Sequence, residues 1–165
     1  RTETMSPPIS GFGTIILRPS FLQWVTDKYG WFAVNIIGYC LYADSELPTA
    51  LLVLMIAMSL HLLYMLLYLR LMKFTVTDQQ IMYRHGVFNR KMEFIELYRV
   101  IDFHEDVSLI QNIFDIKTVT VYSGDRTTPR LRIPGIALGY PLVQTLRERV
   151  EYNKRRKGIY EITNR

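Results

Sequence analysis

The sequence predicts a protein in two parts: an α-helical hairpin that enters a membrane, followed by a small soluble α+β domain. Residues 47 to 69 form a run of 23 residues without formal charge, and roughly 20 apolar residues allow a helix to cross a bilayer core. A shorter apolar run, Trp31 to Ala43, precedes it. From Lys73 onward, apolar and polar residues alternate between closely spaced turn residues, which is typical of short strands.

Charge is distributed unevenly along the 165 residues. Residues 73 to 165 contain 16 of the 20 Lys and Arg residues and 11 of the 15 Asp and Glu residues. This excess of positive charge suits an anionic membrane face or a nucleic acid. Cys40 is the only cysteine and lies in an apolar run, which excludes a disulfide framework and a cysteine-based zinc site.

The composition divides the chain into four segments. We expect a cytoplasmic arm at residues 1–19, a two-helix hairpin at 20–72, a β-rich cytoplasmic domain at 73–158 and a tail at 159–165. Ser20 followed by Gln23 matches a capping box, so the first helix is expected to begin at Ser20. An acidic turn, Asp44-Ser45-Glu46, separates the two helices.

Aromatic and basic residues flank both helices at the positions expected for the membrane interface. Such residues anchor spanning helices at the level of the lipid headgroups. The expected anchors are Trp24, Lys28, Tyr29, Trp31, Arg70 and Lys73. The uncharged part of the first helix is only about 15 residues, roughly 22 Å long, so a re-entrant first helix is the alternative to a full crossing.

The distribution of basic residues predicts the orientation of the hairpin. Arg18 and Lys28 flank its start and Arg70, Lys73 and Arg84 flank its end, whereas the intervening turn has no basic residue. The positive-inside rule therefore places both termini in the cytoplasm.

Asn35, Ser59 and His61 are polar residues within the apolar spans. Counted from the turn, Asn35 and Ser59 or His61 fall at similar depths. We expect a hydrogen bond across the hairpin. An ion or proton path through His61 is the alternative, but no carboxylate lies in either span to serve as its partner.

Six short strands and two helices are predicted after Lys73. The strands are expected near residues 74–77, 81–84, 92–97, 99–104, 117–123 and 130–133, with helical turns at 108–114. Leu142, Val143, Leu146 and Val150 line one face of a closing helix. Gly158 is the expected C-terminal cap of this helix.

This order of segments resembles the bacterial pleckstrin-homology-like (PH-like) domain of membrane-flanked proteins. The matching residues are Arg18-Pro19-Ser20 before the hairpin, Phe74 to Asp78, Ile81 to Arg84, Gly86-Val87-Phe88, Glu96-Leu97, Arg99-Val100-Ile101, Leu109 to Phe114, Thr118 to Val121 and Ile133-Pro134-Gly135. The resemblance implies a curved antiparallel β-barrel capped by a C-terminal helix, no family-wide catalytic residues and a place in the bacterial inner membrane. One departure is Phe114-Asp115-Ile116-Lys117, where the family usually has glycine.

The residues of the soluble part offer little chemistry. No phosphate-binding glycine loop, nucleophile elbow or zinc-protease motif occurs. His104-Glu105-Asp106 is the one local group of metal-capable side chains, but consecutive strand residues point to alternating faces, so a solvated strand end is the preferred interpretation. We therefore expect no catalytic residue, no metal, no cofactor, no small-molecule substrate and no enzyme.

Basic residues gather around one expected turn, at Arg84, His85, Arg90 and Lys91. These residues follow the second helix closely and are candidates for contact with lipid headgroups, where each is worth on the order of 1 kcal/mol. Positive-inside charge without a ligand is the preferred interpretation of these residues. Lys154 to Lys157 suit a solvated helix end, and the tail lacks the aromatic platform that nucleic-acid binding needs.

Two hypotheses about function follow. The first is a non-catalytic membrane protein whose PH-like domain binds a protein partner or further copies of itself, through a sheet edge or the groove beside the closing helix. The second is recognition of anionic lipid headgroups, in envelope maintenance or in resistance to membrane-active compounds.

Overall fold

A computed structural model describes residues 11–44 and 48–159. Ser45 and Glu46 of the expected acidic turn lie outside the described residues, as do residues 1–10 and 160–165 of the expected arm and tail. The elements along the chain are β1 (Ile15–Leu17), α1 (Phe21–Asp44), α2 (Thr49–Leu71), β2 (Lys73–Val76), β3 (Gln80–His85), β4 (Lys91–Glu96), the 3-10 turn η1 (Leu97–Arg99), β5 (Val100–Asp106), α3 (Leu109–Ile113), β6 (Ile116–Ser123), β7 (Arg130–Ala137) and α4 (Leu142–Arg156).

The strands form two antiparallel sheets, in the orders β1-β2-β3-β4 and β5-β6-β7. The prediction of an α+β domain with antiparallel strands and a C-terminal helix is confirmed. The strands form two separate hydrogen-bonded sheets, where one curved barrel was expected. Strand β1 comes from the expected arm and pairs with β2, Ile16 lying opposite Thr75.

The core lies between the two sheets and is closed by α4. Alternate residues of β2 and β6 point inward, so that Phe74, Val76, Val119 and Val121 are fully buried. The apolar face predicted for the closing helix packs against them, through Leu142, Leu146 and Val150 with Val143 at its margin. Gly158, with a φ of 69°, caps this helix as expected.

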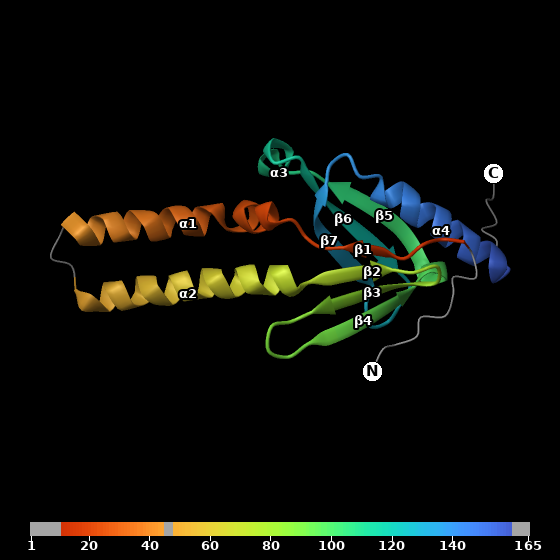
Figure 1. Cartoon of the computed structure of the whole chain (residues 1–165), viewed down its shortest axis with the longest axis horizontal. Coiled ribbons are helices and arrows are strands. Elements are labelled where there is room, and N and C mark those ends of the chain that lie inside the picture. Colours follow the sequence, from red (N-terminus) through yellow and green to blue (C-terminus); the bar gives the residue numbers. More distant parts are fainter. Residues whose placement is uncertain (1–10, 45–47, 160–165) are drawn as a thin grey trace.

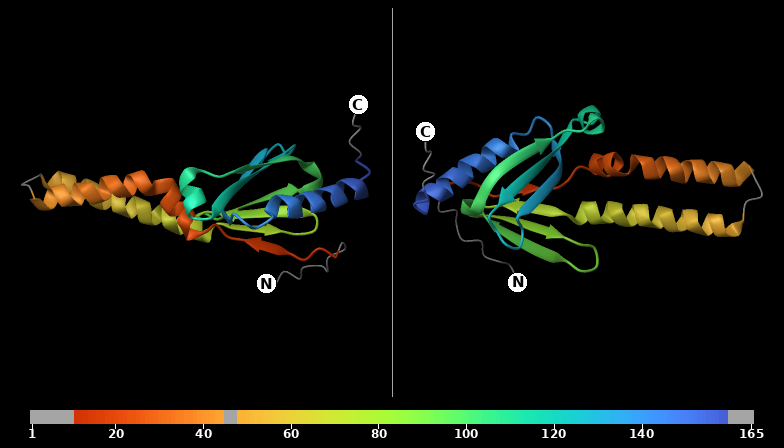
Figure 2. Two further views of the ribbon diagram at one scale, coloured as in Figure 1. Left: turned by 90° about the horizontal axis from the view of Figure 1, so that it is seen from above. Right: turned by 180° about the vertical axis from the view of Figure 1, so that it is seen from behind.

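The two long helices form an antiparallel hairpin that projects from one end of the sheets, while α4 lies toward the other end (Figures 1 and 2). The start of α1 is joined to the β-domain by buried polar contacts. Gln111 Nε2 donates to Gln23 Oε1 at 2.9 Å and to Thr118 Oγ1 at 2.8 Å. Gln23 therefore does not complete the expected capping box, although Ser20 Oγ accepts from the amide of Leu22 at 3.3 Å.

A glycine allows α1 to approach β7 closely. Gly135 has a φ of 67°, and its carbonyl accepts from the Ser20 amide at 2.9 Å. A Cβ at this position would lie 2.7 Å from the Ser20 nitrogen. Gly135 belongs to the Ile133-Pro134-Gly135 segment of the resemblance, and the close approach explains why glycine is needed there.

Among the described helices, only α2 is long and apolar enough to cross a membrane by length and composition. The expected crossing by α1 is not confirmed. Its sequence carries Asp27 and Lys28 in the first third and Asn35 near the middle, which lowers its mean hydropathy.

Asp115 takes the place where the family usually has glycine. Its φ is 52°, the only positive φ of a described residue other than glycine. The left-handed conformation costs most L-residues roughly 1 to 2 kcal/mol.

We therefore expect Asp115→Gly to stabilise the domain by about 1 kcal/mol, which a thermal melt of the full chain in nanodiscs would detect as a higher Tm. Asp106→Gly, on strand β5, is the control and should lower the Tm because glycine in a strand is unfavourable. A lower Tm for Asp115→Gly would show that its carboxylate, and not its backbone conformation, is what matters.

Candidate functional site

Five basic side chains converge on one hollow at the foot of α2. The hollow has a volume of about 200 Å³ and is lined by Arg18, Arg70, Leu71, Lys73, Arg84, Gly86 and Arg90. These residues come from the segment after β1, the last turn of α2, strands β2 and β3, and the β3–β4 loop. Among the described residues, no carboxylate lines the hollow. We call the five cations Arg18, Arg70, Lys73, Arg84 and Arg90 the basic pocket.

Strand register holds two of these cations face to face. Lys73 on β2 is paired with Arg84 on β3, and like charges at directly opposed positions destabilise a sheet. Within the described part of the chain, none of the five cations forms a salt bridge. The pocket therefore concentrates positive charge that the described residues do not neutralise.

The tight turn after β3 shapes one wall of the pocket. Gly86 has a φ of 103°, and a Cβ there would lie 2.1 Å from the carbonyl oxygen of Asn89. Only glycine fits this backbone, so Gly86 allows the loop to fold back and bring Arg90 beside Arg84.

His85 points away from the basic pocket because adjacent strand residues face opposite sides of a sheet. Its Nδ1 lies 3.0 Å from the hydroxyl of Tyr68, and its Nε2 lies 3.2 Å from Glu93 Oε1. Tyr83 stacks on the imidazole at 4.5 Å, and burial raises the pKa of the Tyr83 hydroxyl above its ordinary value. Lys91 is exposed on β4 and does not line the pocket either.

The structure thus brings together Arg84 and Arg90 from the predicted headgroup candidates with Arg70 and Lys73 from the predicted anchors. Arg18 joins them, although it was not among the residues predicted to contact headgroups. Its convergence with Arg84 depends on β1 pairing with β2, a contact between distant segments that no local pattern indicated.

The residues of α1 that were predicted as interfacial anchors differ in their exposure. Tyr29 and Trp31 are exposed. Trp24 turns inward, where its Nε1 donates to the Leu62 carbonyl at 3.1 Å. Lys28 lies at the root of the hairpin, in a separate cavity that Trp24 and Arg132 also line.

The polar residues of the hairpin contact one another across the helices. Ser59 Oγ donates to Asn35 Oδ1 at 3.2 Å, and Asn35 Nδ2 donates to the Met55 carbonyl at 3.2 Å. His61 is exposed and lies outside this group. The expected hydrogen bond across the hairpin is thus present between Ser59 and Asn35.

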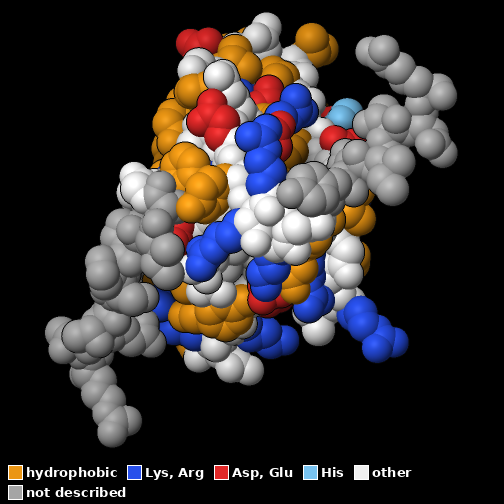
Figure 3. Space-filling model, turned by 90° about the vertical axis from the view of Figure 1, so that its right-hand side faces the viewer, with side chains coloured by type: hydrophobic (Ala, Val, Ile, Leu, Met, Phe, Trp, Pro, Cys, Tyr) orange, Lys and Arg blue, Asp and Glu red, His pale blue; other side chains and the backbone are white. Residues whose placement is uncertain are grey.

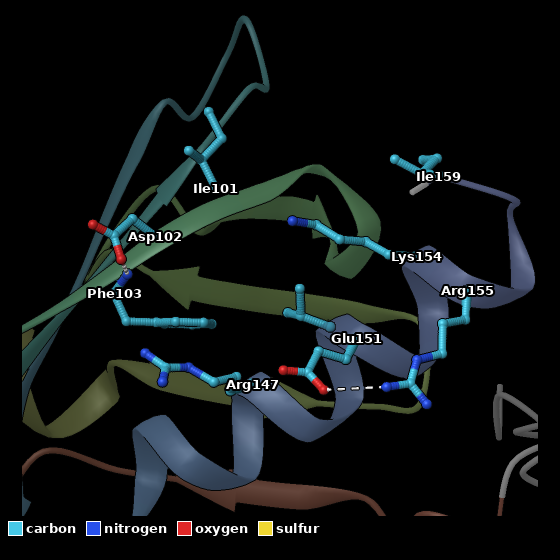
Figure 4. Close-up of a pocket in the computed structure, with 9 residues that line it drawn as sticks. Ile101, Asp102, Phe103, Arg147, Glu151, Lys154, Arg155 and Ile159 are labelled. Carbon is cyan, nitrogen blue, oxygen red and sulfur yellow. Dashed lines mark hydrogen bonds and ion pairs between the residues drawn. The ribbon is translucent and has the colours of Figure 1, made fainter. Parts of the chain in front are cut away.

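A second hollow, of about 310 Å³, runs between α4 and the free edge of β5 (Figure 4). Apolar, basic and acidic side chains line it. Ile101 and Ile159 stand at its two sides, the Phe103 ring reaches toward Arg147, and Glu151 pairs with Arg155 at 3.9 Å. We call this hollow the α4–β5 groove.

The end of the molecule opposite the hairpin carries charges of both signs. Lys and Arg side chains spread across it with Asp and Glu side chains between them (Figure 3). In the last turn of α4, Arg155 pairs with Glu151 and Lys157 lies 4.3 Å from the Tyr98 ring centre. This surface differs from the basic pocket, where the cations have no acidic neighbours.

The expected strand end at His104 to Asp106 is solvent-exposed. His104 Nε2 lies 3.1 Å from Asp106 Oδ1, while Glu105 pairs with Lys117 at 2.8 Å. In the described ranges, no group of three or more His, Cys, Asp or Glu residues is placed to hold a metal ion.

Comparison with known families agrees with this architecture. A model of the family described as Bacterial PH domain matches residues 32–154. The chain belongs to the Bacterial PH domain family. No curated protein and no solved structure matched it. The match begins within α1 and ends within α4, so it takes in about half of α1 and all of α2 as well as β2 to β7. Membership indicates a module that interacts with lipids or proteins.

Proposed function

We propose that the α1–α2 hairpin anchors this Bacterial PH domain in the bacterial inner membrane, with both termini in the cytoplasm, and that the basic pocket binds the phosphates of anionic lipid headgroups. The observation that carries the proposal is the convergence of five cations, without a carboxylate, at the foot of the most apolar helix.

Three features support the membrane anchor. Large apolar side chains of both helices point outward, among them Ile36 and Leu41 on α1 and Val53 and Leu60 on α2. Exposure of such a continuous apolar surface to water is unfavourable. Asn35 and Ser59 are paired within the hairpin, and Arg70 and Lys73 lie at the end where the positive-inside rule needs them.

Location favours a lipid ligand over a soluble anion for the basic pocket. With α2 in the bilayer, Arg70 in its last turn lies at headgroup level. The pocket would then open where lipid phosphates are concentrated. Each cation near such a surface contributes on the order of 1 kcal/mol of binding free energy. Each guanidinium group can also donate two parallel hydrogen bonds to the oxygens of one phosphate.

The test is the triple variant Arg18→Gln, Arg84→Gln and Arg90→Gln in the full chain. We expect it to lose about 3 kcal/mol, roughly a hundredfold, in affinity for phosphatidylglycerol, measured by native mass spectrometry of lipid retained after release from mixed nanodiscs. Retention of phosphatidylcholine should not change.

A matched triple variant on surfaces away from the hairpin is the control. Arg126→Gln, Arg155→Gln and Arg156→Gln removes the same charge from exposed positions and should retain phosphatidylglycerol like the unmodified chain. Equal losses of phosphatidylglycerol affinity in both variants would show that binding depends on net charge alone and would reject a specific pocket.

Protein binding at the α4–β5 groove is the second candidate function. Ile101 is 68% exposed beside an unpaired sheet edge, and such edges accept an added strand in many complexes. The partner would be another protein of a membrane complex or a second copy of this chain.

Mass measurement of the full chain in mild detergent tests this candidate. We expect an assembly larger than a monomer that Ile101→Glu disperses. A monomer without a co-purifying protein would reject it.

A further inference from the structure

Three apolar side chains outside the hairpin are more exposed than any other large apolar side chain of the described residues. Phe88 is 90% exposed, Leu109 is 86% exposed and Ile113 is 76% exposed. Single exposed apolar residues are common on protein surfaces. The positions of these three side chains beside the hairpin, and not their exposure alone, indicate a shared role.

Phe88 lies beside α2. It occupies the tip of the β3–β4 loop, and its ring stacks on that of Tyr64 with centres 6.3 Å apart and planes 13° apart. Tyr64 precedes the end of α2 at Leu71 by seven residues, which is roughly 10 Å along the helix. The loop thus runs along the hairpin and does not turn toward the rest of the β-domain.

Leu109 and Ile113 lie on the other side of the hairpin root, beside the start of α1. Between them, Gln111 is buried and bonds to Gln23 of α1. Ser108 and Gln111 form a capping box that fixes this short helix. Because Gln111 faces α1, its neighbours two residues away on either side are left uncovered.

Both segments therefore project from the end of the sheets that carries the hairpin, α3 near α1 and the β3–β4 loop near α2 (Figures 1 and 2). The cations Arg84 and Arg90 flank Phe88 in the sequence and line the basic pocket. Exposed apolar side chains next to cations are typical of protein surfaces that insert about 5 to 10 Å into the boundary between headgroups and acyl chains.

We propose that Phe88 on one side of the hairpin and Leu109 with Ile113 on the other insert into the interfacial layer of the same membrane. Together with the hairpin, these contacts would support the β-domain at separate points and hold the basic pocket against the headgroups. The proposal rests on the proposed membrane anchor, and its partner is the lipid surface itself. Gly86 contributes by permitting the turn that aims Phe88 along α2.

Site-directed fluorescence in nanodiscs tests the proposal on the full chain. Cys40 is free and exposed, so a Cys40→Ala background allows an environment-sensitive fluorophore, NBD, at one introduced cysteine. We expect labels at Phe88→Cys and Leu109→Cys to show blue-shifted emission and at least twofold quenching by phospholipids that carry a nitroxide near the headgroup. Arg126→Cys, at an exposed position of the β6–β7 loop, is the control and should show neither effect.

A label at Leu60→Cys separates this proposal from the membrane anchor. Quenching at Leu60 by deep nitroxides, with the labels at positions 88 and 109 behaving like the label at position 126, would overturn this inference and leave the anchor intact. Absence of quenching at Leu60 would reject the anchor and this inference together. Substitution at these exposed positions removes no core contact, and an unchanged Tm checks that each variant is folded.

Discussion

The double variant Leu60→Arg and Leu63→Arg is expected to prevent stable membrane integration. Both side chains point outward near the middle of α2, with Leu60 62% exposed. Each arginine at the centre of a spanning helix costs about 2.5 to 3.5 kcal/mol, so the pair opposes insertion by roughly 5 to 7 kcal/mol. In bacterial membranes washed with alkaline carbonate, the variant should appear in the supernatant or be degraded, while the unmodified chain stays in the pellet.

The control for this variant keeps the same two positions apolar. Leu60→Ile and Leu63→Ile conserve volume and hydropathy, so this chain should pellet like the unmodified one. Retention of the double arginine chain in the pellet would contradict a membrane role for α2 and would favour its burial against another protein.

The largest loss of stability is expected from Phe74→Ala. The Phe74 ring is fully buried between the sheets and stacks on Tyr83 with ring centres 4.7 Å apart. Replacing a buried phenylalanine by alanine costs about 3 to 5 kcal/mol, because it removes apolar contacts and leaves a cavity. Hydrogen exchange of β-domain amides in nanodiscs should show a matching fall in protection against global unfolding.

Phe94→Ala is the control, because it removes the same ring from a position on β4 that is 48% exposed. Its effect on amide protection in the core strands should be less than half that of Phe74→Ala, because fewer buried apolar contacts are lost. If Phe74→Ala proved equally mild, the core would have to be organised differently from the two-sheet arrangement.

Local patterns predicted most of the elements because their signals are local. Alternation located β2, β3 and β6, and the apolar positions of α4 showed which face it buries. Ser108 and Gln111 begin α3 where helical turns were expected. Asp115 departs from the family pattern, but the turn is kept because the aspartate adopts the positive φ that glycine would supply.

Features that depend on distant contacts were beyond the reach of these patterns. Pairing of β1 with β2 brings Arg18 to the basic pocket, and the three residues of β1 are too short a run for a firm prediction. The inward turn of Trp24 needs the Leu62 carbonyl as an acceptor. His85 is different, since alternation along β3 already indicated that it cannot share a face with Arg84.

If the hairpin crosses the inner membrane, the PH domain is left in the cytoplasm. Reporters fused after Arg165 test this topology most directly, using a fluorescent protein that folds only in the cytoplasm and a phosphatase that is active only outside it. We expect a fluorescent, phosphatase-inactive chain that sediments with the inner membrane. An active phosphatase fusion, or a chain that stays in the supernatant without detergent, would contradict it.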